Sequence, residues 1–410
     1  MDQALPVAEF TQFYTEVWSS CSDKLPELSY TYPKNEKKAR EKYFEKFIDS
    51  INKRSNKKEL KSGPAEKLTP LARTLFKSVF DYEEEQLDVI LSEDYKQMTK
   101  DFIRMSRKFD PEVDLDDVFQ ACRNAWIMNG IQLMLGLKIE LTPSIFAYSM
   151  LYPYSDNYLD DPALSQQEKK SFSYRFRKKL SGEKVFAENE NEARIFRLVE
   201  MIEGQFDRDK FPKVYLSLLA IHDAQVKSLC LIDPDENLSE KEVLNICLEK
   251  GGTSVLADGY LVAGDISKEQ ALFFFGFGAY LQLIDDIQDV KEDSCAGLLT
   301  IFSQASSYQN LDDYTARTFH FGNYVFDLMD TFKGRKLPVF KSLMKKSVET
   351  MLLETILLSE TYYSPDFISL TENYSPLSIN YLKKRRSKLS PQRVSFMKKI
   401  VESTVAELQF

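Results

Sequence analysis

The sequence predicts an all-α fold, and three observations lead to this expectation. Glycine and proline are scarce, with 14 and 15 among 410 residues, whereas turn-rich β folds need more of both. From Leu68 onward apolar residues recur at three- and four-residue spacing, as in Leu68, Leu71, Leu75 and Val79, which is the pattern of helices that bury one face. No stretch alternates apolar and polar residues in the way that a half-buried strand does. We therefore expect helices throughout.

The amino-terminal part of the chain differs in composition from the rest. Residues 33–67 are rich in Lys, Glu, Asn and Ser, and their two kinds of charge are interleaved. Such mixing is typical of a solvated helix rather than a basic docking surface, and we expect this helix to be followed by a loop that ends at Gly63-Pro64. The sequence thus predicts an amino-terminal helical and loop extension over residues 1–67 and a single α-helical catalytic domain over residues 68–410.

Three helix starts can be located from capping patterns. Thr142-Pro143 combines an N-cap residue with proline in the first turn, and Ser165-x-x-Glu168 and Ser239-x-x-Glu242 have the form of capping boxes. We expect helices to begin near residues 143, 166 and 240. The longest apolar run, residues 271–284, is shorter than the roughly 20 residues that a membrane span needs, so we expect it to form a buried helix.

Composition excludes several classes of function. Lys and Arg number 54 against 63 Asp and Glu, a formal charge of −9, which argues against a broad nucleic-acid surface. The only two histidines, His222 and His320, rule out a multi-histidine metal centre, and His222 has the setting of an interior histidine. Five dispersed cysteines fit neither a disulfide framework nor a zinc ribbon, and no secretory signal is visible. We expect a soluble, cytoplasmic protein without a transmembrane segment.

A first acidic cluster is the segment Asp156-Asn157-Tyr158-Leu159-Asp160-Asp161-Pro162. Asp156 and Asp160 are four residues apart and would share one face of a helix. Pro162 indicates that this helix ends there, so the carboxylates would gather at a carboxyl terminus, where the helix dipole is already negative. The arrangement becomes favourable when cations lie between the carboxylates.

A second acidic cluster follows the apolar run directly. Asp285, Asp289 and Asp293 fall at i, i+4 and i+8 and would form one stripe along a helix, with Asp286 beside them. Like charges at this spacing destabilise a helix unless something neutralises them. Mg²⁺ suits this role because it takes oxygen ligands and is commonly shared between carboxylates and a substrate phosphate. The alternative is a solvated acidic face, but two such clusters beside apolar helices favour a joint metal site.

With these two clusters, the sequence resembles the class I isoprenoid (terpenoid) synthase superfamily, and most closely the bacterial terpene cyclases related to squalene and phytoene synthases. Asp156, Asp160 and Asp161 match its first motif, Asp-Asp-x-x-Asp or Asp-x-x-x-Asp. Its second motif, (Asn/Asp)-Asp-x-x-(Ser/Thr)-x-x-x-Glu, is matched by residues 285–293, with Asp289 and Asp293 in place of the hydroxyl and the Glu. The resemblance covers roughly residues 110–300.

The resemblance implies a helical bundle whose active-site cavity lies between facing helices, with three Mg²⁺ ions held by both motifs and gripping a substrate diphosphate. It implies metal ligands among Asp156, Asp160, Asp161, Asp285, Asp286, Asp289 and Asp293, with Asp156, Asp160, Asp285 and Asp289 as the catalytic group. It also implies a helix break at Lys250-Gly251-Gly252 that lines the pocket near the diphosphate. Asp258-Gly259-Tyr260, further along the same segment, is a candidate part of the same pocket wall.

Candidate pocket residues come from the same region of the chain. The resemblance implies that Lys250, at the helix break, is a diphosphate-binding residue, and Arg123 is a second candidate if its own helix lines the cavity. Candidate cavity residues are Trp126, Asn129, Gly251, Gly252 and Gln282. The last also belongs to a Gln-x-x-Asp-Asp-x-x-Asp pattern that resembles the one in prenyltransferases.

These features predict a Mg²⁺-dependent terpene synthase that ionises a polyprenyl diphosphate, releases diphosphate and forms a cyclic or rearranged terpene. One alternative is a trans-prenyltransferase or a coupling enzyme like squalene or phytoene synthase. A second alternative is a helical scaffold without catalytic activity. A second copy of the chain, in a homodimer, is a further candidate partner.

Overall fold

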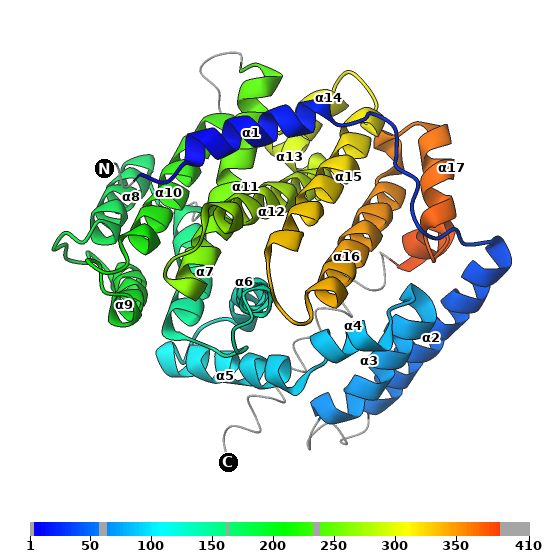
Figure 1. Ribbon diagram of the computed structural model, residues 1–410, viewed down its shortest axis with the longest axis horizontal. Coiled ribbons are helices and arrows are strands. Elements are labelled where there is room, and N and C mark those ends of the chain that lie inside the picture. The colour runs from blue at the N-terminus through cyan, green and yellow to red at the C-terminus, as the bar shows by residue number, and fades with distance from the viewer. Residues whose placement is uncertain (1–3, 57–63, 161–163, 233–237, 386–410) are drawn as a thin grey trace. The chain divides into compact units, whose positions relative to one another are not determined.

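A computed structural model describes residues 4–56, 64–160, 164–232 and 238–385, and these are the residues to which the following statements refer. All regular secondary structure within these ranges is helical, so the predicted all-α class is confirmed (Figure 1). None of the described helices is both long and apolar enough to cross a membrane.

The contacts within the chain divide it into two units. Unit 1 comprises the described parts of Met1–Ser22, Asp117–Gln309 and Arg317–Arg335, and unit 2 those of Asp23–Asp116, Asn310–Ala316 and Lys336–Phe410. This division does not follow the predicted boundary at residue 67, because the first helix packs with unit 1 and the following segment with unit 2.

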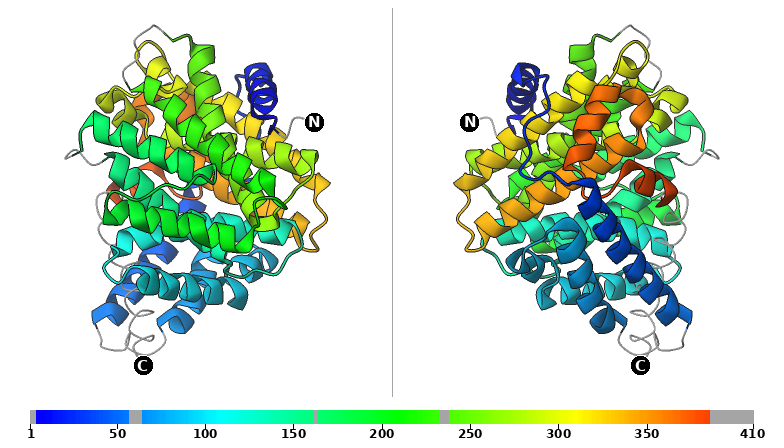
Figure 2. Two further views of the ribbon diagram at one scale, coloured as in Figure 1. Left: turned by 90° about the vertical axis from the view of Figure 1, so that its left-hand side faces the viewer. Right: turned by 90° about the vertical axis from the view of Figure 1, so that its right-hand side faces the viewer.

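Unit 1 holds most of the central helices of the chain. Its helices are α1 (Val7–Ser20), α6 (Leu115–Met134), α7 (Pro143–Asp160), α8 (Gln166–Leu180), α9 (Glu190–Gln205), α10 (Pro212–Ser228), η2 (Leu229–Leu231), α11 (Glu240–Ala263), α12 (Lys268–Gln288), α13 (Val290–Ala296), α14 (Ile301–Ser306) and η3 (Leu328–Thr331), together with most of α15 (Asp312–Asp327). The core of the unit is the pair α11 and α12, which run side by side (Figure 1). Helices α1, α7 and α10 each pack against α11, and the left view of Figure 2 faces the green helices α8 to α10.

Helix α1 packs on this pair through a row of large side chains. Phe10, Tyr14 and Trp18 are spaced at four residues and are all buried, as expected for one face of an amphipathic helix. The Tyr14 hydroxyl donates a hydrogen bond of 2.7 Å to the carbonyl oxygen of Leu272. Helix α1 is thus part of the core of unit 1.

Unit 2 is a smaller set of helices with its own core. It contains α2 (Lys34–Asn56), α3 (Pro64–Phe80), α4 (Glu84–Ile90), α5 (Glu93–Phe109), α16 (Leu337–Leu358), η4 (Glu360–Tyr362) and α17 (Pro365–Tyr374). Its core gathers Val79, Leu357, Leu377 and Leu382. The predicted solvated helix is α2, whereas the predicted loop before Gly63 lies outside the described residues.

The capping patterns locate the helix starts correctly. Helix α7 begins at Pro143, α8 at Gln166 and α11 at Glu240. Ser165 and Ser239 each form the predicted capping box, in which the serine accepts from the N3 amide and the N3 glutamate accepts from the cap amide. Local hydrogen bonds of this kind depend only on neighbouring residues, which explains why the sequence reveals them.

Candidate functional site

Helix α12 carries the predicted apolar run and ends at the second acidic cluster. A capping box formed by Ser267 and Gln270 starts the helix, and Phe273, Phe274 and Phe275 are completely buried within it. The run therefore forms a buried helix, as predicted. It anchors the acidic segment that follows in a fixed position relative to α11.

The acidic row does not lie on one uninterrupted helix, in contrast to the prediction. Helix α12 ends at Gln288, Asp289 has non-helical backbone angles (φ −101°, ψ 11°), and α13 begins at Val290. The i+4 backbone bonds nevertheless continue, from the Asp289 amide to the Asp285 carbonyl (2.9 Å) and from the Asp293 amide to the Asp289 carbonyl (2.8 Å). Like charges four residues apart disfavour a regular helix, and the interruption falls in the middle of the row.

The carboxyl groups of this cluster all hold their protons more tightly than usual. Burial, together with smaller contributions from neighbouring carboxylates, raises the pKa of Asp286 to about 7 and that of Asp293 to about 6. Burial also raises the pKa of Asp285 and of Asp289. Because each group disfavours the charge of the next, the row is a place where a divalent cation would be stabilised in exchange for protons.

Asp286 differs from its neighbours in its surroundings. Its side chain is only 4% exposed, and its Oδ1 atom accepts a hydrogen bond of 2.8 Å from Gln282 Nε2. Its Oδ2 atom is buried without a hydrogen-bond partner among the described residues. The Cys247 thiol lies beside it, and burial together with this carboxyl raises the thiol's pKa. Gln282 thus holds the inner carboxyl of the row, whereas Asp285 and Asp289 are exposed and Asp293 is half-buried.

Helix α11 continues without interruption through Lys250-Gly251-Gly252, so the predicted helix break there is wrong. The glycines instead allow α12 to approach closely. A Cβ atom on Gly251 would lie 2.5 Å from the carbonyl oxygen of Gly278, and one on Gly278 would lie 2.1 Å from that of Gly251. A Cβ atom on Gly252 would meet the ring of Phe275 at 2.5 Å. Gly251 and Gly252 are therefore helix-packing residues.

This close approach sets Lys250 beside the acidic row. The positive charge of Lys250 lowers the pKa of Asp285, against the larger effect of burial, and that of Arg123 acts in the same direction. Arg123 is an exposed residue of α6. The structure thus brings both predicted diphosphate-binding cations within electrostatic reach of the second acidic cluster.

The other predicted residues of α6 have different surroundings. Trp126 is half-buried and makes an edge contact with Phe119, at 5.8 Å between ring centroids. Asn129 is completely buried, and its Nδ2 atom donates to Gln132 Oε1 at 2.8 Å. The Oδ1 atom of Asn129 has no partner among the described residues.

The first acidic cluster is described only in part. The backbone of Asp156 and Asp160 belongs to the last turns of α7, which ends at Asp160. Their side chains, and Asp161 as a whole, lie outside what the structure describes. Among the described residues, no three acidic, histidine or cysteine side chains are already gathered closely enough to hold a metal ion.

Helix α7 runs antiparallel to α11, and two hydrogen bonds define their register. Ser144 Oγ donates to the Leu261 carbonyl at 2.8 Å, and the Tyr148 hydroxyl donates to the Ser254 carbonyl at 3.4 Å. Movement along α7 toward Asp156 thus corresponds to movement along α11 toward Lys250. At 1.5 Å per residue on both helices, the acidic end of α7 falls roughly level with the part of α11 that carries this lysine.

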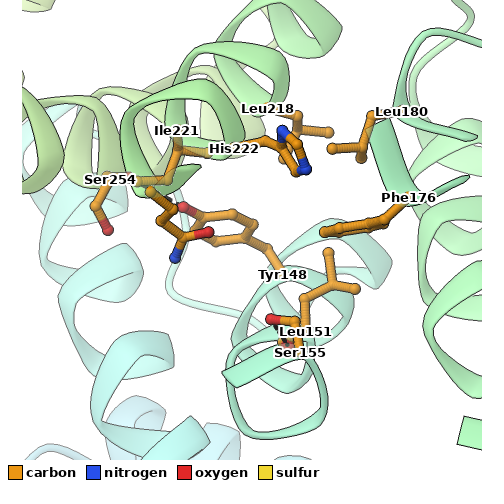
Figure 3. Close-up of a pocket in the computed structure, with 10 residues that line it drawn as sticks. Tyr148, Leu151, Ser155, Phe176, Leu180, Leu218, Ile221, His222 and Ser254 are labelled. Carbon is orange, nitrogen blue, oxygen red and sulfur yellow. Dashed lines mark hydrogen bonds between the residues drawn. The ribbon is translucent and has the colours of Figure 1, made fainter. Parts of the chain in front are cut away.

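One described cavity lies between α7, α8, α10 and α11 (Figure 3). Each of the four helices contributes to its lining, for example through Tyr148 of α7, Phe176 of α8, His222 of α10 and Ser254 of α11. Its volume of about 50 Å³ has room for a few water molecules but not for a polyprenyl chain. The five predicted cavity residues do not line it.

The histidine in this cavity is a satisfied interior residue, as predicted. His222 is 6% exposed, and its Nε2 atom donates to the carbonyl oxygen of Ser173 at 3.1 Å. Burial lowers the pKa of its imidazole, so the ring is neutral at pH 7. The described contacts of His222 are thus those of a packing residue.

One buried acid lies in the segment Asp258-Gly259-Tyr260, which was predicted only as a candidate part of the pocket wall. Asp258 of α11 is completely buried, and burial raises its pKa well above the usual range. Its Oδ1 atom accepts from Asn124 Nδ2 at 3.2 Å, and the same Nδ2 atom lies 3.3 Å from Ser149 Oγ. The available signal was an acid in the middle of the apolar stretch Val255–Ala263, which lacks the four-residue spacing of the other clusters.

A comparison with models of known protein families finds no match to this chain, and a comparison with curated protein sequences finds none either. The functional argument therefore depends on the residues and the geometry described above.

Proposed function

We propose that this protein is a Mg²⁺-dependent class I terpene synthase that ionises a polyprenyl diphosphate and forms a cyclic or rearranged terpene. The observation that carries the proposal is the row Asp285, Asp289 and Asp293 beside Lys250, with the pKa of each carboxyl raised. A row of carboxylates that lacks matching positive charge attracts cations, and a neighbouring lysine and arginine attract an anion. A metal diphosphate offers both charges in one ligand.

The donor set fits magnesium rather than a softer metal. All candidate ligands are carboxylate oxygens, which Mg²⁺ prefers, whereas zinc or copper sites use histidine or cysteine. Asp285, Asp289 and Asp293 would hold the ion on the α12–α13 side, and the end of α7 supplies Asp156 and Asp160 as candidate ligands from another helix. When bound, Mg²⁺ would neutralise charge on the departing diphosphate.

The remaining steps belong to side chains of the chain itself. Lys250 and Arg123 would bind phosphate oxygens and hold the diphosphate as the carbon–oxygen bond breaks. The electron pair of that bond leaves with the diphosphate, so the substrate becomes an allylic cation and no protein nucleophile is required. The rearranged cation then loses a proton, for which the released diphosphate is the acceptor, and the neutral terpene forms.

The test is turnover of a series of allylic diphosphates, from geranyl to heptaprenyl, with Mg²⁺ and with product analysis by mass spectrometry. We expect a hydrocarbon or terpene alcohol from a single allylic substrate, and no product from a double variant, Asp285→Asn with Asp289→Asn. The exposed Asp209→Asn variant is the matched control, since it removes one carboxylate outside the cluster. Normal turnover by the double variant would contradict the proposal.

The same experiment separates the alternatives. Longer diphosphates formed only when isopentenyl diphosphate is added would identify a chain-elongating prenyltransferase, and dimeric hydrocarbons would identify a coupling enzyme. A scaffold without activity would give no product, and its melting temperature would not rise when Mg²⁺ and pyrophosphate are added together.

A further inference from the structure

One buried polar cluster joins the three helices that carry charged groups of the candidate site. We call Asp258, Asn124 and Ser149 the buried cluster; they belong to α11, α6 and α7. Asp258 and Ser149 are both completely buried. Asn124 lies between them, with its Nδ2 atom 3.2 Å from Asp258 Oδ1 and 3.3 Å from Ser149 Oγ. A single amide group thus contacts both other helices.

Each member of the buried cluster shares its helix with a candidate site residue. Asn124 directly follows Arg123, which is within electrostatic reach of Asp285. Asp258 lies on the same helix as Lys250, about 12 Å further along the axis, and Ser149 lies about two turns before the acidic end of α7. A sliding or turning motion of α6 or α7 against α11 would break these hydrogen bonds and move the site residues by a similar amount.

The buried cluster contains polar groups whose burial lowers the stability of the folded protein. A completely buried carboxyl group must keep its proton, and burial raises the pKa of Asp258 accordingly. Its Oδ2 atom finds no hydrogen-bond partner among the described residues. An apolar side chain of similar volume would pack without these costs, but it could not accept the hydrogen bond from Asn124. Directional bonding between helices is what the acid adds.

We propose that Asp258 is a positioning residue, which acts through Asn124 and Ser149 to hold α6 and α7 in register on α11 and thereby sets the grip of the candidate site on diphosphate. This inference rests on the proposed function, because it assigns the diphosphate site to residues on these helices. Asp258 itself contacts neither the metal nor the substrate in this proposal.

The first test compares three variants in binding of inorganic pyrophosphate with Mg²⁺, measured by isothermal titration calorimetry well below the melting temperature. Asp258→Ala should weaken binding by about tenfold or more, because displacements near 1 Å have large effects on positioned groups. Asp258→Asn should stay within about twofold of wild type, because its amide remains neutral and keeps an oxygen for Asn124. Tyr14→Phe, which removes the hydrogen bond to Leu272, should lower the melting temperature without weakening binding.

The second test uses hydrogen exchange of backbone amides, which does not depend on any ligand. Peptides that cover residues 118–130 and 145–155 should exchange at least about tenfold faster in Asp258→Ala than in Asp258→Asn or Tyr14→Phe. If Asp258→Ala does not fold, Asn124→Ala cuts the same contact from α6 and takes its place in both tests.

The outcomes separate the two proposals. Unchanged pyrophosphate binding by folded Asp258→Ala, or an equal loss in Asp258→Asn, overturns the positioning role. Failure of the wild-type protein to bind Mg²⁺ and pyrophosphate overturns the proposed function instead. In that case hydrogen exchange alone tests whether Asp258 holds α6 and α7 in register on α11. Unchanged exchange in Asp258→Ala would overturn this claim as well.

Discussion

Replacement of Asp286 by asparagine should remove a pH-dependent loss of stability from the metal-free protein. The side chain of Asp286 is 4% exposed, and burial raises its pKa from 3.8 to about 7. The folded protein therefore binds this proton more tightly than the unfolded chain does. The stabilising contribution is complete below about pH 4 and is lost as the pH rises through about 7.

The magnitude follows from the difference between the two pKa values. At 1.36 kcal/mol per pH unit, a rise from 3.8 to about 7 corresponds to about 4 kcal/mol. Asparagine cannot ionise, and its oxygen can still accept from Gln282 Nε2. Asp286→Asn should thus match wild type near pH 4 and exceed its unfolding free energy by up to about 4 kcal/mol at pH 8.

The assay is urea unfolding followed by circular dichroism from pH 4 to pH 8, with EDTA present to remove divalent cations. Asp209→Asn, on an exposed loop, is the matched control and should follow the wild-type curve at every pH. If the wild-type and Asp286→Asn stabilities run parallel over the whole range, the burial of an uncompensated carboxyl at this position is refuted.

Three further predictions follow from the same site. Gly278→Ala places a Cβ atom 2.1 Å from the Gly251 carbonyl oxygen and should lower the unfolding free energy by about 2–3 kcal/mol in urea titrations, whereas Gly204→Ala, with open space around it, should raise it by up to about 1 kcal/mol. Lys250→Gln should weaken Mg²⁺-pyrophosphate binding by about tenfold or more in calorimetry, and equal affinity would remove this lysine from the diphosphate site. Mg²⁺ binding at pH 6.5 should release protons, detected as heats that differ between buffers of different ionisation enthalpy, and replacement of Asp293, whose pKa is raised to about 6, by asparagine should reduce this release.

The sequence was most informative where a structural feature depends on neighbouring residues. Ser165 and Ser239 revealed helix starts because a capping box is closed within four residues. The apolar run of α12 revealed a buried helix for a similar reason. These local rules also gave the all-α class, since sparse glycine and proline leave few places for turns.

The sequence was least informative where a residue serves a distant part of the chain. Gly251 and Gly252 were interpreted as a helix break because glycine is a poor helix former. In α11 the low helix propensity of these glycines is offset by the close packing of α12 against them, and the local sequence does not identify that packing partner. The role of Asp258 was not predicted for the same reason, since its contacts come from α6 and α7 rather than from its own helix.

The candidate site was predictable as a set of residue types but not as a geometry. Four-residue spacing identified the acidic row, yet the interruption at Asp289 reflects repulsion and burial that spacing alone does not report. Likewise, the pattern gave no indication that Asp286 is turned into the protein interior against Gln282.

The backbone contact between Gly251 and Gly278 also limits where this protein can change shape. Because neither residue has a side chain, the two backbones are in direct contact there and the helices cannot move closer together. We therefore expect α11 and α12 to move as one rigid unit, so that Lys250 and Asp285 keep their positions relative to each other. Attempts to widen the site for bulkier ligands by directed evolution should therefore begin with α6 and α7 and leave this helix pair untouched.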